Sequence, residues 1–389
     1  MALLYLDVDG FKQVNDSLGY SAGDRLIEQI AERLRGCVRS TDTISRLGDW
    51  EAIEHLREVG EKVVEALREP YLIDDQRVGI SASVGISIFP DDGQSAETLI
   101  KHADMAMYQA KLHDRASLQF FSADMNRQAI ERRTLMNELC HAIAGGQLSL
   151  SYQPKISLRT GQPFGAEALL RWQHPERGPI EPDHFVPMAE ESRDLMVSIG
   201  GWVLEEACRQ ARSWRDAGHL PLVISVNVST VQLQYDGFVE HVADVLERYR
   251  LSPECLQLEL TESVLMSDVH GATDRVRELK DLGVCIAVDD FGTGYSSLSY
   301  LKDLPVDELK IDRSFVSDIG ADVDSDAMVQ AIIRIGQGLQ LRVVAEGVER
   351  QEPVSFLAAN GCDALQGFYF SRPLPPEELE RQFVASRSR

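Results

Sequence analysis

The sequence predicts an α/β protein with a C-terminal (β/α)8 barrel, preceded by a shorter α+β domain. From about residue 147 to the end, eight short apolar segments alternate with helix-length segments, which is the size and rhythm of such a barrel. The 389 residues are enough for two or three domains. A helix-like stretch over 125–145, stopped by Gly145 and Gly146, separates the two parts. We therefore expect domains at 1–124 and 146–389, joined by a helix over 125–145.

The first region mixes strand-like and helix-like segments without regular alternation. One helix shows its pattern well, because Leu26, Ile30 and Leu34 recur at near-helical spacing. A second helix begins after Ser95, which has the chemistry of an N-cap. In chain order the expected elements are a strand at Ala2–Leu6, helices at Ala22–Val38 and Glu51–Leu67, a strand at Val78–Phe89 and a helix at Ser95–Leu112.

The second region contains the eight apolar segments of the predicted barrel. Each is four to eight residues long, and helix-length segments are expected between successive strands. The expected strands are Ser149–Ile156, Ala166–Arg171, Leu222–Val228, Leu256–Leu260, Val284–Val288, Glu308–Ile311, Arg342–Ala345 and Ala364–Phe370.

Composition narrows the class of protein. Lys and Arg number 39 against 62 Asp and Glu, so the net charge of −23 argues against a DNA- or RNA-binding protein. The apolar runs are far shorter than a bilayer requires, so no membrane contact is expected from this chain. The six cysteines are scattered, without paired spacing. We expect a cytoplasmic location, either for the chain alone or as the cytosolic part of a longer, membrane-attached protein.

Polar residues occur where the predicted barrel strands end. In such barrels the active site is built at the carboxyl ends of the strands, so these side chains should converge. Clustered carboxylates repel one another unless a cation lies among them, and oxygen ligands favour Mg²⁺ or Mn²⁺ over zinc. The residues, in strand order, are Glu167, Asn227, Glu259 with Glu262, Asp289-Asp290, Lys310, Glu346 and Gln366.

The pair Asp289-Asp290 suggests two ions. One of two consecutive carboxylates can bridge a pair of ions while its neighbour binds one, and such centres promote displacement at phosphorus. Lys310 could orient the attacking water or offset phosphate charge. A single acidic residue after a strand is usually a helix cap or a solvated loop residue. The recurrence of polar residues at the ends of successive strands is what favours a metal site.

These motifs resemble the EAL domain, a family of cyclic-di-GMP phosphodiesterases. The resemblance covers nearly all of residues 140–385, and no required position is substituted. The matching segments are Tyr152–Lys155, Glu167–Leu169 with Arg171, Phe185–Glu190, Ser225–Ser229, Glu259–Glu262, Asp289–Tyr295, Leu309–Asp312, Ala345–Glu349 and Gln366–Pro373.

The resemblance implies a role for each matched position. Glu262 matches the residue that holds the loop after Asp290, and Gln153, Arg171 and Asp312 match substrate-contacting positions. The implied metal ligands are Glu167, Asn227, Glu259, Asp289, Asp290 and Glu346, and the implied catalytic residues are Glu167, Asp290, Lys310, Glu346 and Gln366.

The expected reaction is metal-dependent hydrolysis of cyclic di-GMP to linear 5′-pGpG, with two Mg²⁺ or Mn²⁺ ions per site. Calcium should inhibit, because its longer bonds suit a tight two-ion site poorly. The resemblance also implies a homodimer formed through the barrel surface near the fifth strand and its following loop and helix. The alternative is a receptor that binds cyclic di-GMP without hydrolysing it.

The first region resembles an incomplete GGDEF domain, the diguanylate cyclase family. Asp7 matches a metal ligand, while Asn15 and Asp24 match guanine-binding positions. The Gly-Gly-Asp-Glu-Phe signature is missing, because after Gly48 the chain continues Asp49-Trp-Glu-Ala. We therefore expect no cyclase activity and a regulatory or vestigial role. The segment after Gly48 is too short to contain the central strand hairpin of the family. Sensing of GTP through Asn15 and Asp24 is therefore disfavoured, since loss of that hairpin weakens the phosphate end of the nucleotide pocket.

Overall fold

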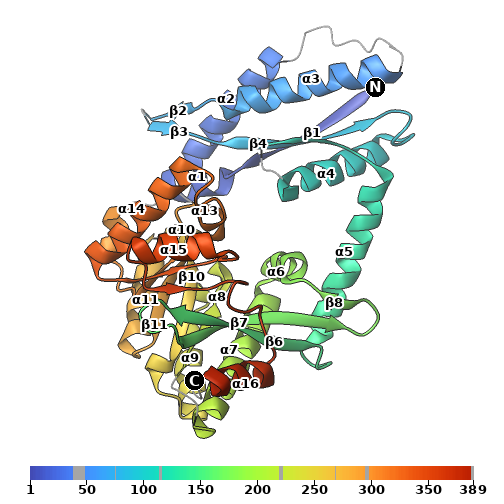
Figure 1. Cartoon of the computed structure of the whole chain (residues 1–389). Helices are drawn as coiled ribbons and strands as arrows, with labels where there is room; N and C mark the ends of the chain where they lie inside the picture. The colour runs from blue at the N-terminus through green and yellow to red at the C-terminus, as the bar shows by residue number, and fades with distance from the viewer. Residues whose placement is uncertain are drawn as a thin grey trace. The chain divides into compact units, whose positions relative to one another are not determined.

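The computed structural model describes residues 1–37, 49–74, 76–113, 116–218, 222–267, 269–293 and 298–386. The chain divides into two compact units, Met1–Leu135 and Met136–Arg389. The division falls inside helix α5 (Ala123–Ala142), which ends three residues before the predicted stop at residue 145 (Figure 1).

The first unit is built around a small sheet in the order β1-β4-β5. Strand β1 runs antiparallel to β4, and β4 runs parallel to β5, while β2 and β3 form a separate hairpin. The elements are β1 (Ala2–Asp9), α1 (Phe11–Leu18), α2 (Tyr20–Cys37), α3 (Asp49–Arg68), β2 (Tyr71–Ile73), β3 (Gln76–Val78), β4 (Ser81–Ile88), α4 (Ala96–His113) and β5 (Leu118–Phe120).

The core of this unit lies between β4 and its helices. Strand β4 is buried from Ala82 to Ser87. At Gly85 a side chain would collide with the carbonyl oxygen of Ala103, so the absence of a Cβ allows α4 to approach the strand closely.

Two sequence expectations for this unit need correction. The strand predicted over Val78–Phe89 is shorter, because β4 runs from Ser81 to Ile88 and Val78 ends the separate strand β3. Helix α1 was not predicted, since its eight residues are too few to show a helical repeat, although Gly10 and Gly19 bound it with positive φ.

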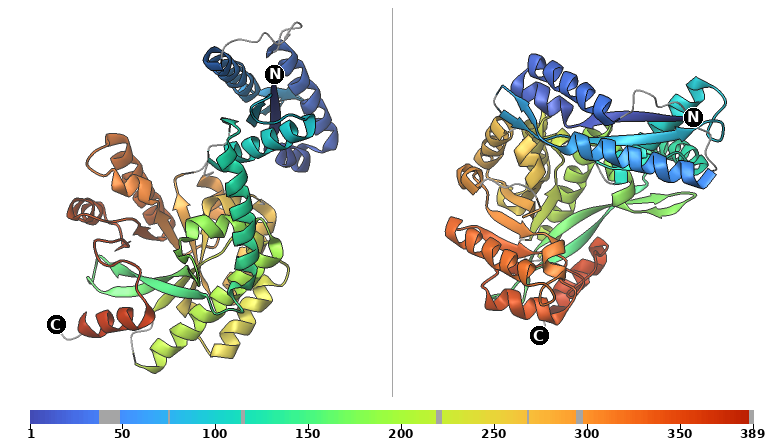
Figure 2. Two further views of the ribbon diagram at one scale, coloured as in Figure 1. Left: turned by 90° about the vertical axis from the view of Figure 1, so that its right-hand side faces the viewer. Right: turned by 90° about the horizontal axis from the view of Figure 1, so that it is seen from above.

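The second unit contains the barrel strands with helices on their outer side (Figure 2). Its elements are β6 (Leu148–Ser157), β7 (Pro163–His174), β8 (Gly178–Ile180), α6 (Pro182–Glu190), α7 (Arg193–Asp216), β9 (Val223–Asn227), α8 (Thr230–Leu233), α9 (Phe238–Tyr249), the 3₁₀ turn η1 (Pro253–Cys255), β10 (Leu256–Thr261), α10 (Glu262–Ser267), α11 (Val269–Asp281), β11 (Cys285–Phe291), α12 (Leu298–Asp303), β12 (Glu308–Ile311), α13 (Arg313–Ser317), α14 (Val323–Leu339), β13 (Arg342–Ala345), α15 (Gln351–Ala359), β14 (Ala364–Leu365) and α16 (Pro376–Ser386).

The predicted closed eight-stranded barrel is confirmed. Strands follow in the order β6-β14-β13-β12-β11-β10-β9-β7, and pairing of β6 with β7 closes the ring, while β8 extends β7 outside it. Strands β10 and β12 are buried along almost their whole length, as expected for parallel strands covered by helices.

One strand departs from the predicted (β/α)8 pattern. Strand β6 runs antiparallel to both neighbours, β7 and β14, whereas the other barrel pairs are parallel. Only residues 158–162 connect β6 to β7, which is too short for a crossover helix but enough for a hairpin. Residue numbers on β6 therefore increase away from the rim where the parallel strands end.

No helix in the described part of the chain is both long enough and apolar enough to cross a membrane.

Candidate metal centre at the barrel rim

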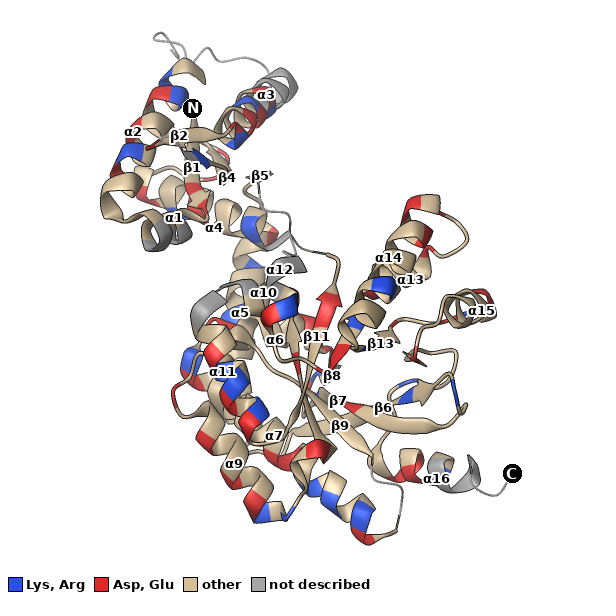
Figure 3. Cartoon of the chain, turned by 90° about the vertical axis from the view of Figure 1, so that its left-hand side faces the viewer, with Lys and Arg blue, Asp and Glu red and all other residues tan. Residues whose placement is uncertain are grey.

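The rim at the carboxyl ends of the parallel strands gathers the polar residues that the sequence singled out. Figure 3 shows acidic residues at the end of β11, where Asp289 and Asp290 lie. The others lie on neighbouring strands or just after them: Glu167 within β7, Asn227 at the end of β9, Glu259 on β10, Lys310 on β12, Glu346 after β13 and Gln366 after β14.

Lys310 lies at the centre of this cluster with its side chain almost fully buried. Its Nζ contacts a carboxylate oxygen of Glu259, and lies 2.9 Å from Asp289 Oδ2 and 2.5 Å from Glu346 Oε1. Glu167 Oε2 is 3.7 Å away. Four carboxylates from different strands thus surround one ammonium group, and their convergence follows from the parallel strand order.

Glu167 is held by two amides. Asn227 Nδ2 donates to Glu167 Oε1 at 2.6 Å, and Gln366 Nε2 donates to Oε2 at 2.6 Å. Gln366 Nε2 also donates to Gln153 Oε1 at 3.1 Å, and Gln153 donates onward to the carbonyl oxygen of Ser371. The Oε1 atom of Gln366 is buried and has no hydrogen-bond partner in the described part of the protein, so it offers a further acceptor beside the carboxylates.

Asp289 and Asp290 differ in orientation because β11 is irregular at its end. The register with β12 shifts between Val288 and Phe291, and Asp290 adopts φ 53°, a left-handed conformation that Asp tolerates better than most residues. The backbone N–H of Asp290 donates to Asp289 Oδ1 at 2.9 Å. Burial raises the pKa of Asp290 to about 6, and the neighbouring carboxylates of Asp289 and Asp312 act in the same direction.

The carboxylates form two groups that share Glu346. In each group one oxygen per residue lies within 4.8 Å of the others, and the groups are Glu167, Glu259, Glu346 and Asp289, Asp290, Glu346. If all five carboxylates are ionised, Lys310 leaves four negative charges unbalanced, which two divalent cations would neutralise. Burial raises the pKa of Glu167, and that of Glu346 well above its ordinary value, although Lys310 opposes both shifts. Oxygen donors with this excess charge suit Mg²⁺ or Mn²⁺.

The pKa of Asp290 predicts how the metal-free protein responds to pH. Its folded value of about 6 lies above the ordinary 3.8, so the folded state retains a proton that the unfolded state releases. This contribution to stability is complete below about pH 4 and disappears as the pH rises through about 6. With a chelator present, Asp290→Asn should therefore gain melting temperature relative to the unmodified protein as the pH is raised from 4 to 7. A constant difference across this range would contradict the assignment.

The remaining predicted residues lie around the cluster. Glu262 Oε2 accepts a hydrogen bond from Gly292 N at 3.1 Å, at the start of the loop that follows Asp290. Asp312 caps α13 by accepting from Ser314 N at 2.9 Å. Arg171, half-buried on β7, donates to the carbonyl oxygen of Leu170 at 2.8 Å. The rest of the loop, 294–297, lies outside the described residues, as does part of the expected dimer surface.

A second buried cation, for which no role was predicted, lies beneath the cluster. Lys155 Nζ lies 2.6 Å from Glu259 Oε1 and 2.8 Å from Glu308 Oε1. Burial opposes ionisation of Glu259, but Lys155 and Lys310 together lower its pKa to about 2. Alternation along β6 could have flagged Lys155, because it shares an inward face with Gln153.

In the first unit, the matched cyclase positions are only partly assembled. Asp7 forms an ion pair with Lys111. The side chain of Asn15 lies against Gly23, directly before the exposed Asp24. Within the described residues β1 is an edge strand of the sheet, with no strand paired on its other side.

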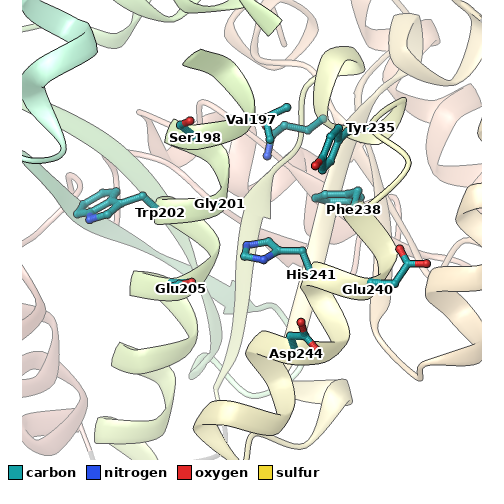
Figure 4. Close-up of a pocket in the computed structure, with 12 residues that line it drawn as sticks. Val197, Ser198, Gly201, Trp202, Glu205, Tyr235, Phe238, Glu240, His241 and Asp244 are labelled. Atoms are coloured by element: carbon teal, nitrogen blue, oxygen red, sulfur yellow. The ribbon is translucent and has the colours of Figure 1, made fainter. Parts of the chain in front are cut away.

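A separate hollow lies on the outside of the barrel, between α7 and α9 (Figure 4). It encloses about 550 Å³ and is lined by residues such as Trp202, Tyr235, Phe238 and His241. None of the predicted site residues lines this groove.

Comparison with known families matches both regions of the chain. The EAL domain model matches residues 136–373, and the diguanylate cyclase GGDEF domain model matches residues 1–117.

Similar proteins carry the same two regions. The chain is 46% identical over 386 residues to the bifunctional diguanylate cyclase/cyclic di-GMP phosphodiesterase MucR of Pseudomonas aeruginosa, covering 97% of this chain and 56% of that protein. It is 39% identical to the cyclic di-GMP phosphodiesterase NbdA of the same organism, covering 100% of this chain and 50% of NbdA. The chain thus spans about half the length of these curated relatives.

A solved structure resembles the second unit. The PaMucR phosphodiesterase, in complex with c-di-GMP, superposes with a TM-score of 0.62 at 48% identity, covering 63% of this chain and 99% of that one.

Proposed function

The chain belongs to the EAL domain family through residues 136–373 and to the GGDEF family through residues 1–117, and on that premise we propose that it hydrolyses cyclic di-GMP to linear 5′-pGpG. The observation that carries the proposal is the buried carboxylate cluster around Lys310, whose excess negative charge calls for divalent cations. The names of the relatives MucR and NbdA support the same reaction.

The residues that would hold two Mg²⁺ or Mn²⁺ ions are Glu167, Asn227, Glu259, Asp289, Asp290 and Glu346. Bound there, such ions supply Lewis-acid chemistry by lowering the pKa of a water and offsetting charge on a phosphate. Lys310 Nζ donates to Glu259 and Asp289 and forms an ion pair with Glu346, so this lysine holds the carboxylates together before any ligand arrives. Gln366 and Asn227 fix the orientation of Glu167.

The substrate would lie over the same rim. Arg171 lies four residues beyond Glu167 on β7 and carries a positive charge suited to a phosphate oxygen. Gln153 positions Gln366 through its side-chain amide, and Asp312 lies beside Asp290. Glu262 holds Gly292, which would couple the loop that follows β11 to the position of Asp290.

The test is mass spectrometry of cyclic di-GMP incubated with the purified chain. With Mg²⁺ or Mn²⁺ we expect linear pGpG, and with a chelator we expect the substrate to remain intact. Stoichiometric binding without product would replace hydrolysis by the receptor function. Absence of both binding and product would contradict any cyclic-di-GMP function.

Calcium is expected to inhibit the Mg²⁺-dependent reaction. Ca²⁺ prefers bonds of about 2.3–2.6 Å and looser geometry than Mg²⁺, whereas the two carboxylate groups here share Glu346 and leave little room for adjustment. Initial rates at fixed Mg²⁺ should fall as Ca²⁺ is added, and excess Mg²⁺ should restore them. A rate that does not change with Ca²⁺ would argue against a tight pair of ions.

We further propose that the first unit makes no cyclic di-GMP. Its signature motif is missing, and Asp7 is engaged by Lys111. Synthesis needs metal ions to neutralise the triphosphate, and among the described residues Asp7 belongs to no cluster of acidic groups that could share them. The assay uses the Glu167→Ala variant, so that any product would survive, with GTP and Mg²⁺. No cyclic di-GMP is expected, and its accumulation would refute this proposal.

A further inference from the structure

Beneath the rim cluster lies a second layer of charge that the proposed reaction does not use. Lys155 comes from β6, the reversed strand, so it lies deeper in the barrel than Gln153. Its side chain is 1% exposed. Its Nζ lies 2.8 Å from Gln257 Oε1, 2.6 Å from Glu259 Oε1 and 2.8 Å from Glu308 Oε1. An ammonium group has three N–H donors, so all of them are used.

Glu259 is shared between the two layers. Its Oε1 faces Lys155 in the interior, while its Oε2 contacts Lys310 at the rim. The inward bond therefore fixes the rotation of the carboxylate and leaves Oε2 as the oxygen presented to the rim. Gln257, which also accepts from Ser225 Oγ at 2.6 Å, anchors Lys155 from the same strand as Glu259.

We propose that Lys155 is a positioning residue for the metal centre, acting through Glu259, which it holds so that one oxygen faces the divalent cations. This inference rests on the proposed function. Groups that orient a metal ligand without touching the metal are commonly worth 10- to 100-fold in metal affinity, which sets the expected size of the effect at about that range.

A purely structural role predicts something different. A buried ion pair can often be replaced by apolar residues without loss of stability, whereas removal of one partner leaves an unpaired buried charge. Lys155→Met alone would leave the buried carboxylates of Glu308 and Glu259 without this counter-charge. The double variant Lys155→Met/Glu308→Leu removes one charge of each sign and should fold, yet it still leaves Glu259 Oε1 without its inward donor.

The experiment is a Mn²⁺ titration of the full chain, without substrate, in which free Mn²⁺ is measured by electron paramagnetic resonance. We expect the double variant to melt close to the unmodified protein and to bind Mn²⁺ about 10- to 100-fold more weakly. Lys280→Met is the matched control, because Lys280 pairs with Asp307 on the outside of the barrel, and its Mn²⁺ affinity should not change.

A folded double variant that binds Mn²⁺ as tightly as the unmodified protein would overturn the role of Lys155 and leave the proposed function intact. If the unmodified protein itself bound no Mn²⁺, the result would contradict the proposed function, on which the role of Lys155 rests. Lys155→Met alone serves as a second variant, and it should show the same weakened binding wherever it folds.

Discussion

Replacement of Glu167 by alanine is expected to lower the rate of cyclic di-GMP hydrolysis on the order of 1,000-fold, because a metal site contributes several kcal/mol to the transition state. Glu167 accepts hydrogen bonds from Asn227 and Gln366, and its carboxylate lies 3.7 Å from Lys310 Nζ. Its removal therefore breaks the contacts between the two amides and the charged cluster. Initial rates measured over a range of Mg²⁺ concentrations would show whether the lost activity returns at high metal.

The fold should survive this change. Removing one carboxylate relieves repulsion among Glu167, Glu259 and Glu346, so the metal-free melting temperature should stay level or rise. Glu176→Ala is the control, since Glu176 is an exposed glutamate that follows the same strand, and it should retain full activity. A Glu167→Ala variant with near-normal turnover would mean that the ligand set is wrong.

Replacement of Lys310 by methionine should affect stability as well as rate. Without Lys310, Asp289 and Glu346 lose their buried counter-charge and Glu259 keeps only Lys155, and breaking a buried pair in this way typically costs about 3–5 kcal/mol. Divalent metal should recover much of that loss, since the cations replace the missing charge. If Lys310 also assists proton transfer, the rate at saturating metal should fall by about 10²- to 10⁴-fold.

The measurement is the free energy of unfolding in urea, with a chelator and with Mn²⁺. Lys280→Met again serves as control, because its partly exposed pair with Asp307 should contribute about 1 kcal/mol or less. Equal loss of stability for Lys310→Met with and without Mn²⁺ would show that no cation binds near this lysine.

The rim cluster could be predicted from the sequence because parallel strands bring their carboxyl ends together. A residue such as Glu346 needs only to follow a strand in order to reach the rim. The reversed strand β6 was missed because apolar runs show where strands are and not which way they run. The short connection at 158–162 carried that information, since it leaves no room for a helix.

The deeper layer could not be predicted in the same way. Lys155, Gln257 and Glu308 meet only because the barrel closes with a particular stagger between β6, β10 and β12. Alternation places each side chain inside, but the depth at which two strands face each other depends on the register of the whole ring. In the first unit, β2 and β3 were missed because three-residue strands carry too little pattern to detect.

The central claim is that the rim carboxylates hold a pair of divalent cations. Anomalous X-ray diffraction from crystals grown with Mn²⁺ tests it most directly. We expect two Mn²⁺ peaks about 3.5–4 Å apart among the rim carboxylates of Glu167, Glu259, Asp289, Asp290 and Glu346. A rim without Mn²⁺, with Lys310 still surrounded by the carboxylates at saturating metal, would contradict it.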